Sequence, residues 1–274
     1  FLDQVSLDNL NNGGNSERGF ARLDWLATPR NTFRMTAMSG RSSFQLANLR
    51  SQQASGQHQR QALRDVSVSL GWLRTLSAQS TVDITASYRA TIAQLFPSAG
   101  DTPVTASQAR HLTTVNVAGR YNRVAGAHVL RIGADIQRFP VSEDFLVGIT
   151  SPDLNIPGTS RYNPNLAPID LTRGGTLFQF SARQTGGLYS GFAQDGVTWG
   201  RLRLTLGLRY DNYRFRVAGN QLQPRLGMAF HIRETGTVLR LSYNRNYQTP
   251  PNENLLLSDS PAAAALAPPG VRQT

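Results

Sequence analysis

The sequence contains no cysteine and no lysine, so all 28 basic residues are arginine. Without cysteine the chain has no disulfide framework and no thiolate metal site. It also lacks any run of about 18 consecutive apolar residues, which argues against a transmembrane helix. The other way to span lipid is a β-barrel, whose closed sheet satisfies the backbone donors and acceptors. Because one side of such a barrel stays polar, the negative mean hydropathy of −0.33 is compatible with it.

The charge is strongly one-sided, with a formal net charge of +11 at pH 7. Such a balance can indicate a nucleic-acid partner. Here the arginines stand singly among aliphatic residues and form no dense basic run. We therefore expect no nucleic-acid partner and interpret the arginines as one solvated face of a sheet.

Few residues could carry chemistry. The four histidines, His58, His111, His128 and His231, are dispersed and lack metal-ligand spacing. No glycine-rich phosphate loop, Gly-x-Ser-x-Gly turn or paired-carboxylate motif occurs. We expect no metal, no cofactor and no catalytic residue, so the chain is not predicted to be an enzyme.

The clearest pattern is an unbroken alternation of apolar and polar residues from Leu202 to Asp211. Successive side chains of a strand point to opposite faces. One face therefore carries Leu202, Leu204, Leu206, Leu208 and Tyr210. A transmembrane strand needs about 9–11 residues, whereas strands of globular proteins cluster near 5–6. Alternating segments of the longer kind recur along the chain and predict a membrane-spanning sheet.

Alternation and turn residues together predict ten strands. The expected ranges are 18–28, 32–41, 63–74, 80–92, 111–122, 127–138, 184–198, 202–215, 222–232 and 237–248. Short connections mostly alternate with long ones, and the longest, 140–182, is rich in Pro, Gly, Asn and Ser. We expect an all-β, antiparallel meander over residues 1–274, a single partial segment of a transmembrane β-barrel with 140–182 as its long outer loop.

Aromatic residues that fall near strand ends predict a girdle at the membrane–water boundary, where an apolar ring and a polar tip are both accommodated. They are Trp25, Trp72, Trp199, Tyr121, Tyr213, Tyr243 and Tyr247.

Four motifs in the last third of the chain follow one another in a specific order. Residues 189–195 read Y-S-G-F-A-Q-D and are followed by Trp199, and residues 204–211 read L-T-L-G-L-R-Y-D. Residues 224–227 then read P-R-L-G, and Arg240 to Tyr243 lead to Tyr247 and a Thr-Pro-Pro turn. This series resembles the barrel of TonB-dependent receptors. Near the start, Arg22-Leu23-Asp24-Trp25 resembles a strand of their Oar-like branch.

The resemblance implies a stretch of a 22-stranded barrel in the outer membrane of a Gram-negative bacterium, in contact with its lipid. Such receptors surround an N-terminal plug and take up a scarce, bulky ligand such as a siderophore or an oligosaccharide. TonB supplies the energy through the plug. The chain contains no recognisable TonB box, plug or closing C-terminal strand. We therefore expect a fragment that lacks the plug and cannot transport alone.

On this register, twelve charged residues line the lumen and are candidates for contact with the plug. They are Arg22, Asp24, Asp83, Arg89, Arg120, Arg131, Asp135, Arg203, Arg209, Asp211, Arg225 and Arg240. Arg209 and Asp211 are the preferred pair, because they lie two apart on one face. The alternative is a hydrated wall whose charges neutralise one another. In the long loop, Arg161, Tyr162, Asn163 and Asn165 are candidates for ligand contact, unless the loop only covers the mouth.

Two other function classes remain open from the residues alone. The first is a passive porin or a small outer-membrane barrel enzyme, for which His111 and Asp101 offer one acid–histidine pair near a loop. The second is a soluble β-sandwich or adhesin, in which the aliphatic face would pack on a second sheet. Sequence upstream and downstream of the chain discriminates the first, and partitioning into detergent discriminates the second.

Overall fold

The computed structural model describes residues 10–249, 255–258 and 260–266. They form ten strands, β1 Gly14–Thr28, β2 Asn31–Gln45, β3 Arg60–Ser77, β4 Ser80–Phe96, β5 Val104–Ala125, β6 His128–Ile149, β7 Phe178–Trp199, β8 Leu202–Arg214, β9 Ala218–Ile232 and β10 Thr237–Asn244. The helical segments are short: α1 Arg50–Ala54, η1 Pro164–Ile169, η2 Leu171–Arg173, α2 Leu255–Ser258 and α3 Pro261–Leu266. No helix among these residues is long and apolar enough to cross a membrane.

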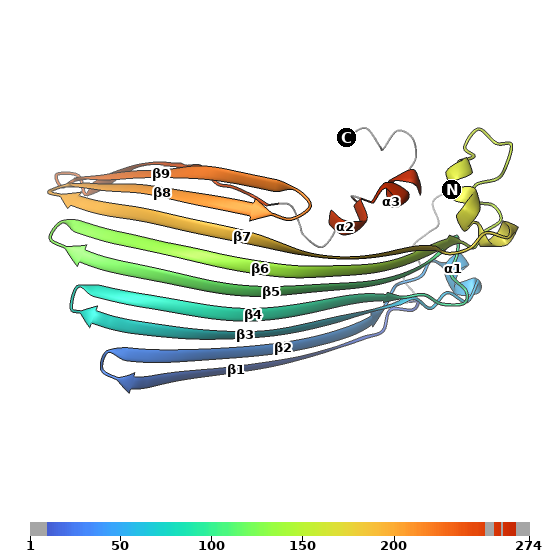
Figure 1. Ribbon diagram of the computed structural model, residues 1–274, viewed down its shortest axis with the longest axis horizontal. Coiled ribbons are helices and arrows are strands. Elements are labelled where there is room, and N and C mark those ends of the chain that lie inside the picture. The colour runs from blue at the N-terminus through green and yellow to red at the C-terminus, as the bar shows by residue number, and fades with distance from the viewer. Residues whose placement is uncertain (1–9, 250–254, 259, 267–274) are drawn as a thin grey trace.

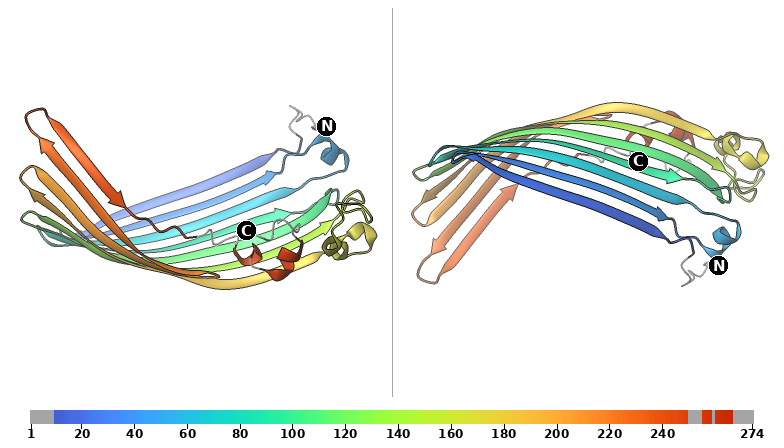
Figure 2. Two further views of the ribbon diagram at one scale, coloured as in Figure 1. Left: turned by 90° about the horizontal axis from the view of Figure 1, so that it is seen from above. Right: turned by 90° about the horizontal axis from the view of Figure 1, so that it is seen from below.

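The strands form one antiparallel meander, in which each strand pairs with the next from β1 to β10. Figure 1 shows the tight hairpins at one end of the sheet and the longer loops at the other. The sheet bends into a trough, and α2 and α3 lie on its concave side (Figure 2). The prediction of an all-β meander of ten long strands is confirmed, and the sheet is an open wall rather than a closed cylinder.

The predicted outer loop 140–182 is too long. Strand β6 continues to Ile149 and β7 already begins at Phe178, so the connection covers only residues 150–177. Residues 139–147 of β6 pair with 178–186 of β7. The proline and polar residues of this region suggested a loop. In the structure, however, this part of β6 stays hydrogen-bonded to β5 on one side and to β7 on the other. The connections 46–59 and 97–103 are shorter than expected for the same reason.

The two faces of the sheet differ in character. Strand pairing places the apolar series of all strands on one face, called the outer face here, and it leaves large apolar side chains exposed. Examples are Leu23, Trp25, Met35, Leu70, Val117, Ile136, Leu206, Leu226 and Leu241. The opposite, concave side is the inner face. No second sheet covers the outer face within the described part of the chain, so these residues are not the interior of a sandwich.

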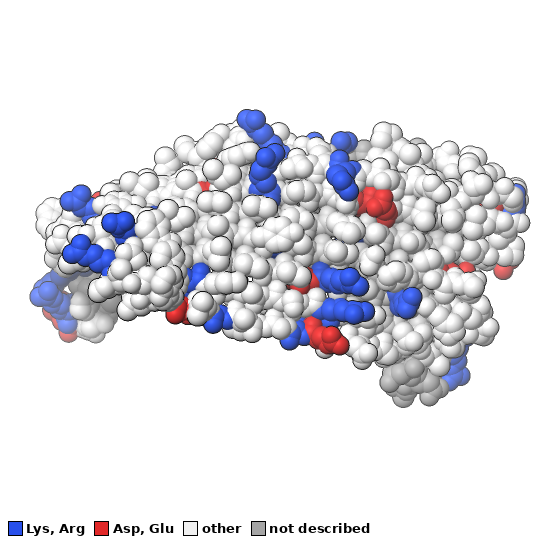
Figure 3. All heavy atoms as spheres, turned by 60° about the horizontal axis from the view of Figure 1, so that its bottom comes forward, with Lys and Arg blue, Asp and Glu red and all other residues white. Residues whose placement is uncertain are grey.

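The outer face carries a band that is uncharged except for Asp195 of β7, which pairs with His128 at 2.6 Å. On β3 the outward residues between Arg64 and Arg74 are all uncharged, and on β6 the same holds between His128 and Arg138. Each interval of ten residues is about 33 Å along a strand. A tilt of about 40° would reduce this to about 25 Å, the height of the apolar band of a membrane barrel. Figure 3 shows charged residues at the left end of the view and again near the middle of its length, with a largely uncharged area between these two groups.

The register gives the tilt independently. Arg74 of β3 is in line with Ile132 of β6, yet the band on β6 ends four residues nearer the hairpins, at His128. The upper limit shifts by the same four residues between Arg64 and Arg138. Four residues are about 13 Å along a strand, and three strand spacings are about 14 Å across. The strands are therefore inclined by about 40° to the band, within the range of membrane barrels.

A small buried core lies on the inner face. The sequence did not predict a core at this place. Phe139, Val141 and Tyr213 are each 1–2% exposed and enclose Leu256 of α2. Tyr247 packs against the same cluster. The prediction that Tyr213 and Tyr247 belong to a boundary girdle is wrong, because β8 turns the odd-numbered Tyr213 inward. Trp25, Trp199 and Tyr243 do lie exposed on or beside the outer face.

Candidate functional site

All twelve charged residues proposed from the sequence share the inner face, according to the strand register. Seven of them take part in ion pairs, which form four separate groups. Arg22 binds Asp24 with its Nε 2.6 Å from Oδ2, and Arg89 binds Asp65 with its Nη2 2.6 Å from Oδ2. Asp83 lies 3.8 Å from Arg34, a looser contact. Asp65 and Arg34 were missed from sequence, because a cross-strand partner becomes visible only when the register is known.

A largely enclosed polar network of the wall surrounds Arg209. Its Nε lies 2.9 Å from Asp211 Oδ1 and its Nη1 lies 3.7 Å from Asp135 Oδ2. Gln223 donates from Nε2 to Asp211, and the backbone N–H of Tyr247 donates to Gln223 Oε1 over 3.0 Å. Asp211 and Gln223 are 5% and 2% exposed. The sequence pair Arg209–Asp211 is therefore part of a larger network across β6, β8 and β9.

Ser190 completes this row of side chains. It lies on β7 between Asp135 and Asp211 in the register, is 7% exposed, and its Oγ has no hydrogen-bond partner. Sequence analysis missed Ser190 and Gln223, since neither is charged and both look like ordinary polar strand residues. Their burial follows from the strands on either side.

Five of the twelve residues have no carboxylate partner within the described chain: Arg120, Arg131, Arg203, Arg225 and Arg240. All five lie in the half of the inner face nearer the hairpins. Arg131 and Arg225 share one row of the register, and Arg203 and Arg240 share another. From β5 to β10 the inner face thus has neutralised charges away from the hairpins and a positive region towards them, whereas on β1 to β4 the pairs Arg22–Asp24 and Arg34–Asp83 lie near the hairpins.

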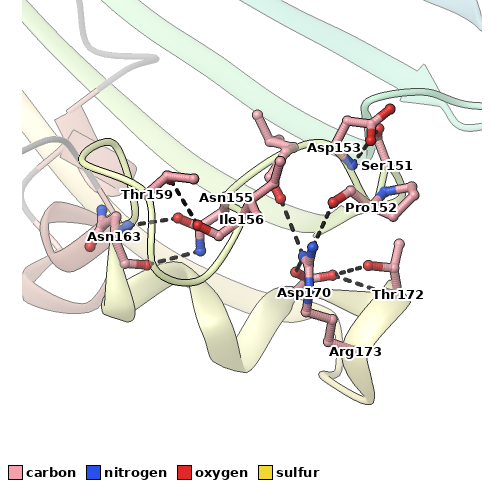
Figure 4. A network of polar contacts seen from close by, with 11 residues as sticks. Ser151, Pro152, Asp153, Asn155, Ile156, Thr159, Asn163, Asp170, Thr172 and Arg173 are labelled. Carbon is pink, nitrogen blue, oxygen red and sulfur yellow. Dashed lines mark hydrogen bonds and ion pairs between the residues drawn. The ribbon is translucent and has the colours of Figure 1, made fainter.

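The outer loop 150–177 is held together by its own polar contacts (Figure 4). Asp170, 2% exposed, binds Arg173 and accepts hydrogen bonds from the hydroxyl and the backbone N–H of Thr172, at 2.6 and 3.0 Å. Arg173 in turn donates to the carbonyl oxygens of Pro152 and Leu154. The hydrogen bond from the Thr172 side chain, followed by that from Arg173, lowers the pKa of Asp170.

The four loop candidates have different surroundings. Asn163 is used by the loop itself, because its N–H donates to Asn155 Oδ1 over 2.7 Å and its carbonyl accepts from Asn155 Nδ2 over 3.0 Å. Its side chain accepts from the N–H of Asn165. Arg161 is exposed and, with Asn155, borders a hollow of about 410 Å³, whereas Tyr162 is half-buried. Within the residues described, no group of three or more His, Cys, Asp or Glu side chains is placed to hold a metal ion.

A comparison with protein families supplies the decisive observation. Residues 3–271 match the family described as TonB dependent receptor-like, beta-barrel. The chain belongs to the TonB-dependent receptor family. The resemblance read from the four motifs is confirmed at the level of the family, while membership of the Oar-like branch stays a prediction. A search of curated protein sequences finds no match.

Solved structures of the TonB-dependent receptor fold resemble this chain. The copper transporter OprC aligns with a TM-score of 0.65 and 14% identity, over 97% of this chain and 41% of that one. The ferric enterobactin receptor PfeA from Pseudomonas aeruginosa aligns with a TM-score of 0.60 and 17% identity, over 95% and 37%. The ferric yersiniabactin uptake receptor FyuA from Yersinia pestis gives 0.60 and 8%, over 81% and 36%.

These identities show likeness of fold alone. The chain spans between 36% and 41% of the length of the three structures. Each of them is a receptor or transporter by name, and none is named as an enzyme.

Proposed function

We propose that this segment is part of the wall of an outer-membrane receptor that takes up a scarce, bulky ligand with energy supplied through TonB. The observation that carries the proposal is the contrast between the faces: an outer band of ten residues that is uncharged apart from Asp195, and an inner face lined with arginine and aspartate. A charge on the lipid side of a barrel costs about 2–4 kcal/mol at the bilayer midplane, whereas lumen positions tolerate it.

The twelve inner-face residues are proposed to face the plug or the water around it. Arg209 and Asp211 remain the preferred contact, and the network around them presents Asp135 at the surface beside a half-buried guanidinium. The unpaired arginines near the hairpins, such as Arg131 and Arg225, are suited to bidentate binding of plug carboxylates. TonB is then a partner through the plug and not through this segment.

The loop 150–177 is proposed to contact the ligand at the mouth of the barrel. Arg161 and Asn165 are exposed at its surface, and Tyr162 lies beside them. Asn163 is proposed to hold the loop and not the ligand, since its N–H, carbonyl and side chain are engaged within the loop. The names of the similar structures refer to iron chelates and copper, which makes a metal chelate the first ligand class to test.

The test uses the full-length receptor in its bacterial host. Cells with and without TonB receive ferric citrate, a ferric catecholate and a ferric hydroxamate, each carrying radioactive iron, and a labelled maltodextrin. We expect TonB-dependent uptake of one probe above that of cells lacking the receptor. Equal uptake without TonB would support the passive porin instead, and no uptake of any probe would contradict the proposed ligand classes.

A further inference from the structure

The side chain of Glu143 is 0% exposed. It lies on the inner face of β6, and its carboxylate accepts three hydrogen bonds. Oε1 accepts from Gln108 Nε2 over 2.8 Å and from Arg110 Nε over 3.0 Å. Oε2 accepts from the backbone N–H of Leu257 in α2 over 3.2 Å. The Glu143 carboxylate thus binds a segment that begins more than 100 residues later in the chain.

The segment that contains Leu257 also covers an apolar patch beside Glu143. Leu256 is 5% exposed and packs on Phe139, Val141 and Tyr213, while Phe139 stacks on Tyr213 with ring centroids 5.8 Å apart. These side chains point inward from β6 and β8 and would face the lumen without the segment. Exposed to the water of a lumen they would cost roughly 1.5–3 kcal/mol each, so the patch needs a cover.

The segment also reaches the outer loop. Its start is tied to the wall, because the N–H of Tyr247 donates to Gln223. Further on, α2 packs on β6 and β7, and α3 packs on η1 of the loop 150–177. Figures 1 and 2 show α2 and α3 within the concave side, between the strands and the loop.

We infer that the residues after β10 form an internal strap, defined by 247–249, 255–258 and 260–266, and that Glu143 is the positioning residue that latches it. The strap covers the apolar patch, and through α3 it supports the outer loop from the inside. The mouth is therefore built from two segments about 100 residues apart. The inference rests on the proposed function only where the loop is called the ligand-contacting element.

A cross-linking experiment on the full-length receptor tests the position of the strap. The chain has no cysteine, so Ala182→Cys on the inner face of β7 is combined with Leu257→Cys and treated with a short bismaleimide. Ser181→Cys with Leu257→Cys is the matched control, because Ser181 is the adjacent residue and points outward. We expect at least a tenfold higher yield for the first pair. Equal yields, high or low, would overturn the inference.

A second measurement tests the latch. In Glu143→Gln the amide has one acceptor oxygen for three donors, so the 182/257 cross-link should fall several-fold and tryptic cleavage after Arg161 should become several-fold faster. Asp144→Asn is the control, because the neighbouring carboxylate points outward to Ser181, with Oδ1 2.6 Å from its hydroxyl. Identical behaviour of the two variants would refute the role of Glu143.

If Glu143→Gln does not assemble, Leu256→Asp replaces it, with Leu256→Met as the control of similar volume. Faster loop cleavage only in the aspartate variant supports the strap, and unchanged cleavage in both contradicts it. None of these readouts measures transport, so a failure of the proposed uptake function would leave them intact and would be recognised separately.

Discussion

Leu206 lies at the centre of the outer band, and Leu206→Arg would place a positive charge there. The band ends at His128 and Arg138 on β6, which align with Leu204 and Arg214 of β8. The tilt lowers the band by a further two to three residues over two strand spacings, so on β8 it spans roughly 201–212. Leu206 is 54% exposed on this face, and its paired neighbours are Leu226 on β9 and Asp195 on β7.

The expected cost follows from that depth. An arginine at the bilayer midplane destabilises a barrel by about 2–4 kcal/mol, and near the interfaces by about 0–1 kcal/mol. Because an arginine at 206 stands opposite Asp195 of β7, we expect the lower limit for Leu206→Arg, about 2 kcal/mol, which weakens the folding equilibrium by about 30-fold at 1.4 kcal/mol per factor of ten. Thr205→Arg should cost little, because Thr205 points inward between Gly196 and Gly227 and its arginine would be hydrated.

The assay is urea-dependent refolding of the full-length receptor into lipid vesicles, followed by gel mobility. Leu202→Arg, at the lower limit of the band, serves as a depth control and should cost no more than about 1 kcal/mol. Equal destabilisation by arginine at 205 and 206 would refute the assignment of the faces. Equal destabilisation at 202 and 206 would refute the derived tilt while leaving the faces intact.

Three further outcomes are expected. Phe139→Ala should destabilise the receptor by about 3–5 kcal/mol in denaturant titration, because a 2%-exposed ring is removed; a loss below 1 kcal/mol would contradict a packed inner core. Arg209→Met leaves Asp135 and Asp211 without their common cation and should lower the free energy of unfolding by about 1–3 kcal/mol; an unchanged unfolding midpoint would contradict this. The lowered pKa of Asp170 means that its stabilising effect is present above about pH 4 and is lost as the pH falls further, so hydrogen exchange in 150–177 should rise in acid, and Asp170→Asn should remove this dependence.

Strand pattern was readable from sequence because a strand has a two-residue period. Leu206 and Thr205 were assigned to opposite faces from alternation alone, and the pairing of β8 with β9 agrees. The same two-residue period predicted that all twelve charged candidates share one face, and the strand register agrees. Strand ends were less readable: residues 140–149 contain proline and acidic residues that local rules assign to loops, yet they continue β6.

The composition of the site depended on contacts between distant residues. The pair Arg209–Asp211 was visible because its members are two residues apart, whereas Gln223 joins it only through the register of β8 and β9. Tyr213 looked like a boundary aromatic, and the covering segment with Leu256 made it part of a core. Asn163 looked free to bind a ligand, but Asn155 already occupies its backbone groups.

The amino-acid sequence by itself determined the class of fold, the two faces of the wall and the family, because alternation and ordered motifs are local properties of a strand. The tertiary structure alone decided the tilt, the contact between Glu143 and Leu257, and the inward core. These depend on which residues of separate strands come to lie at the same height, and strand pairing, which no single segment encodes, sets that height.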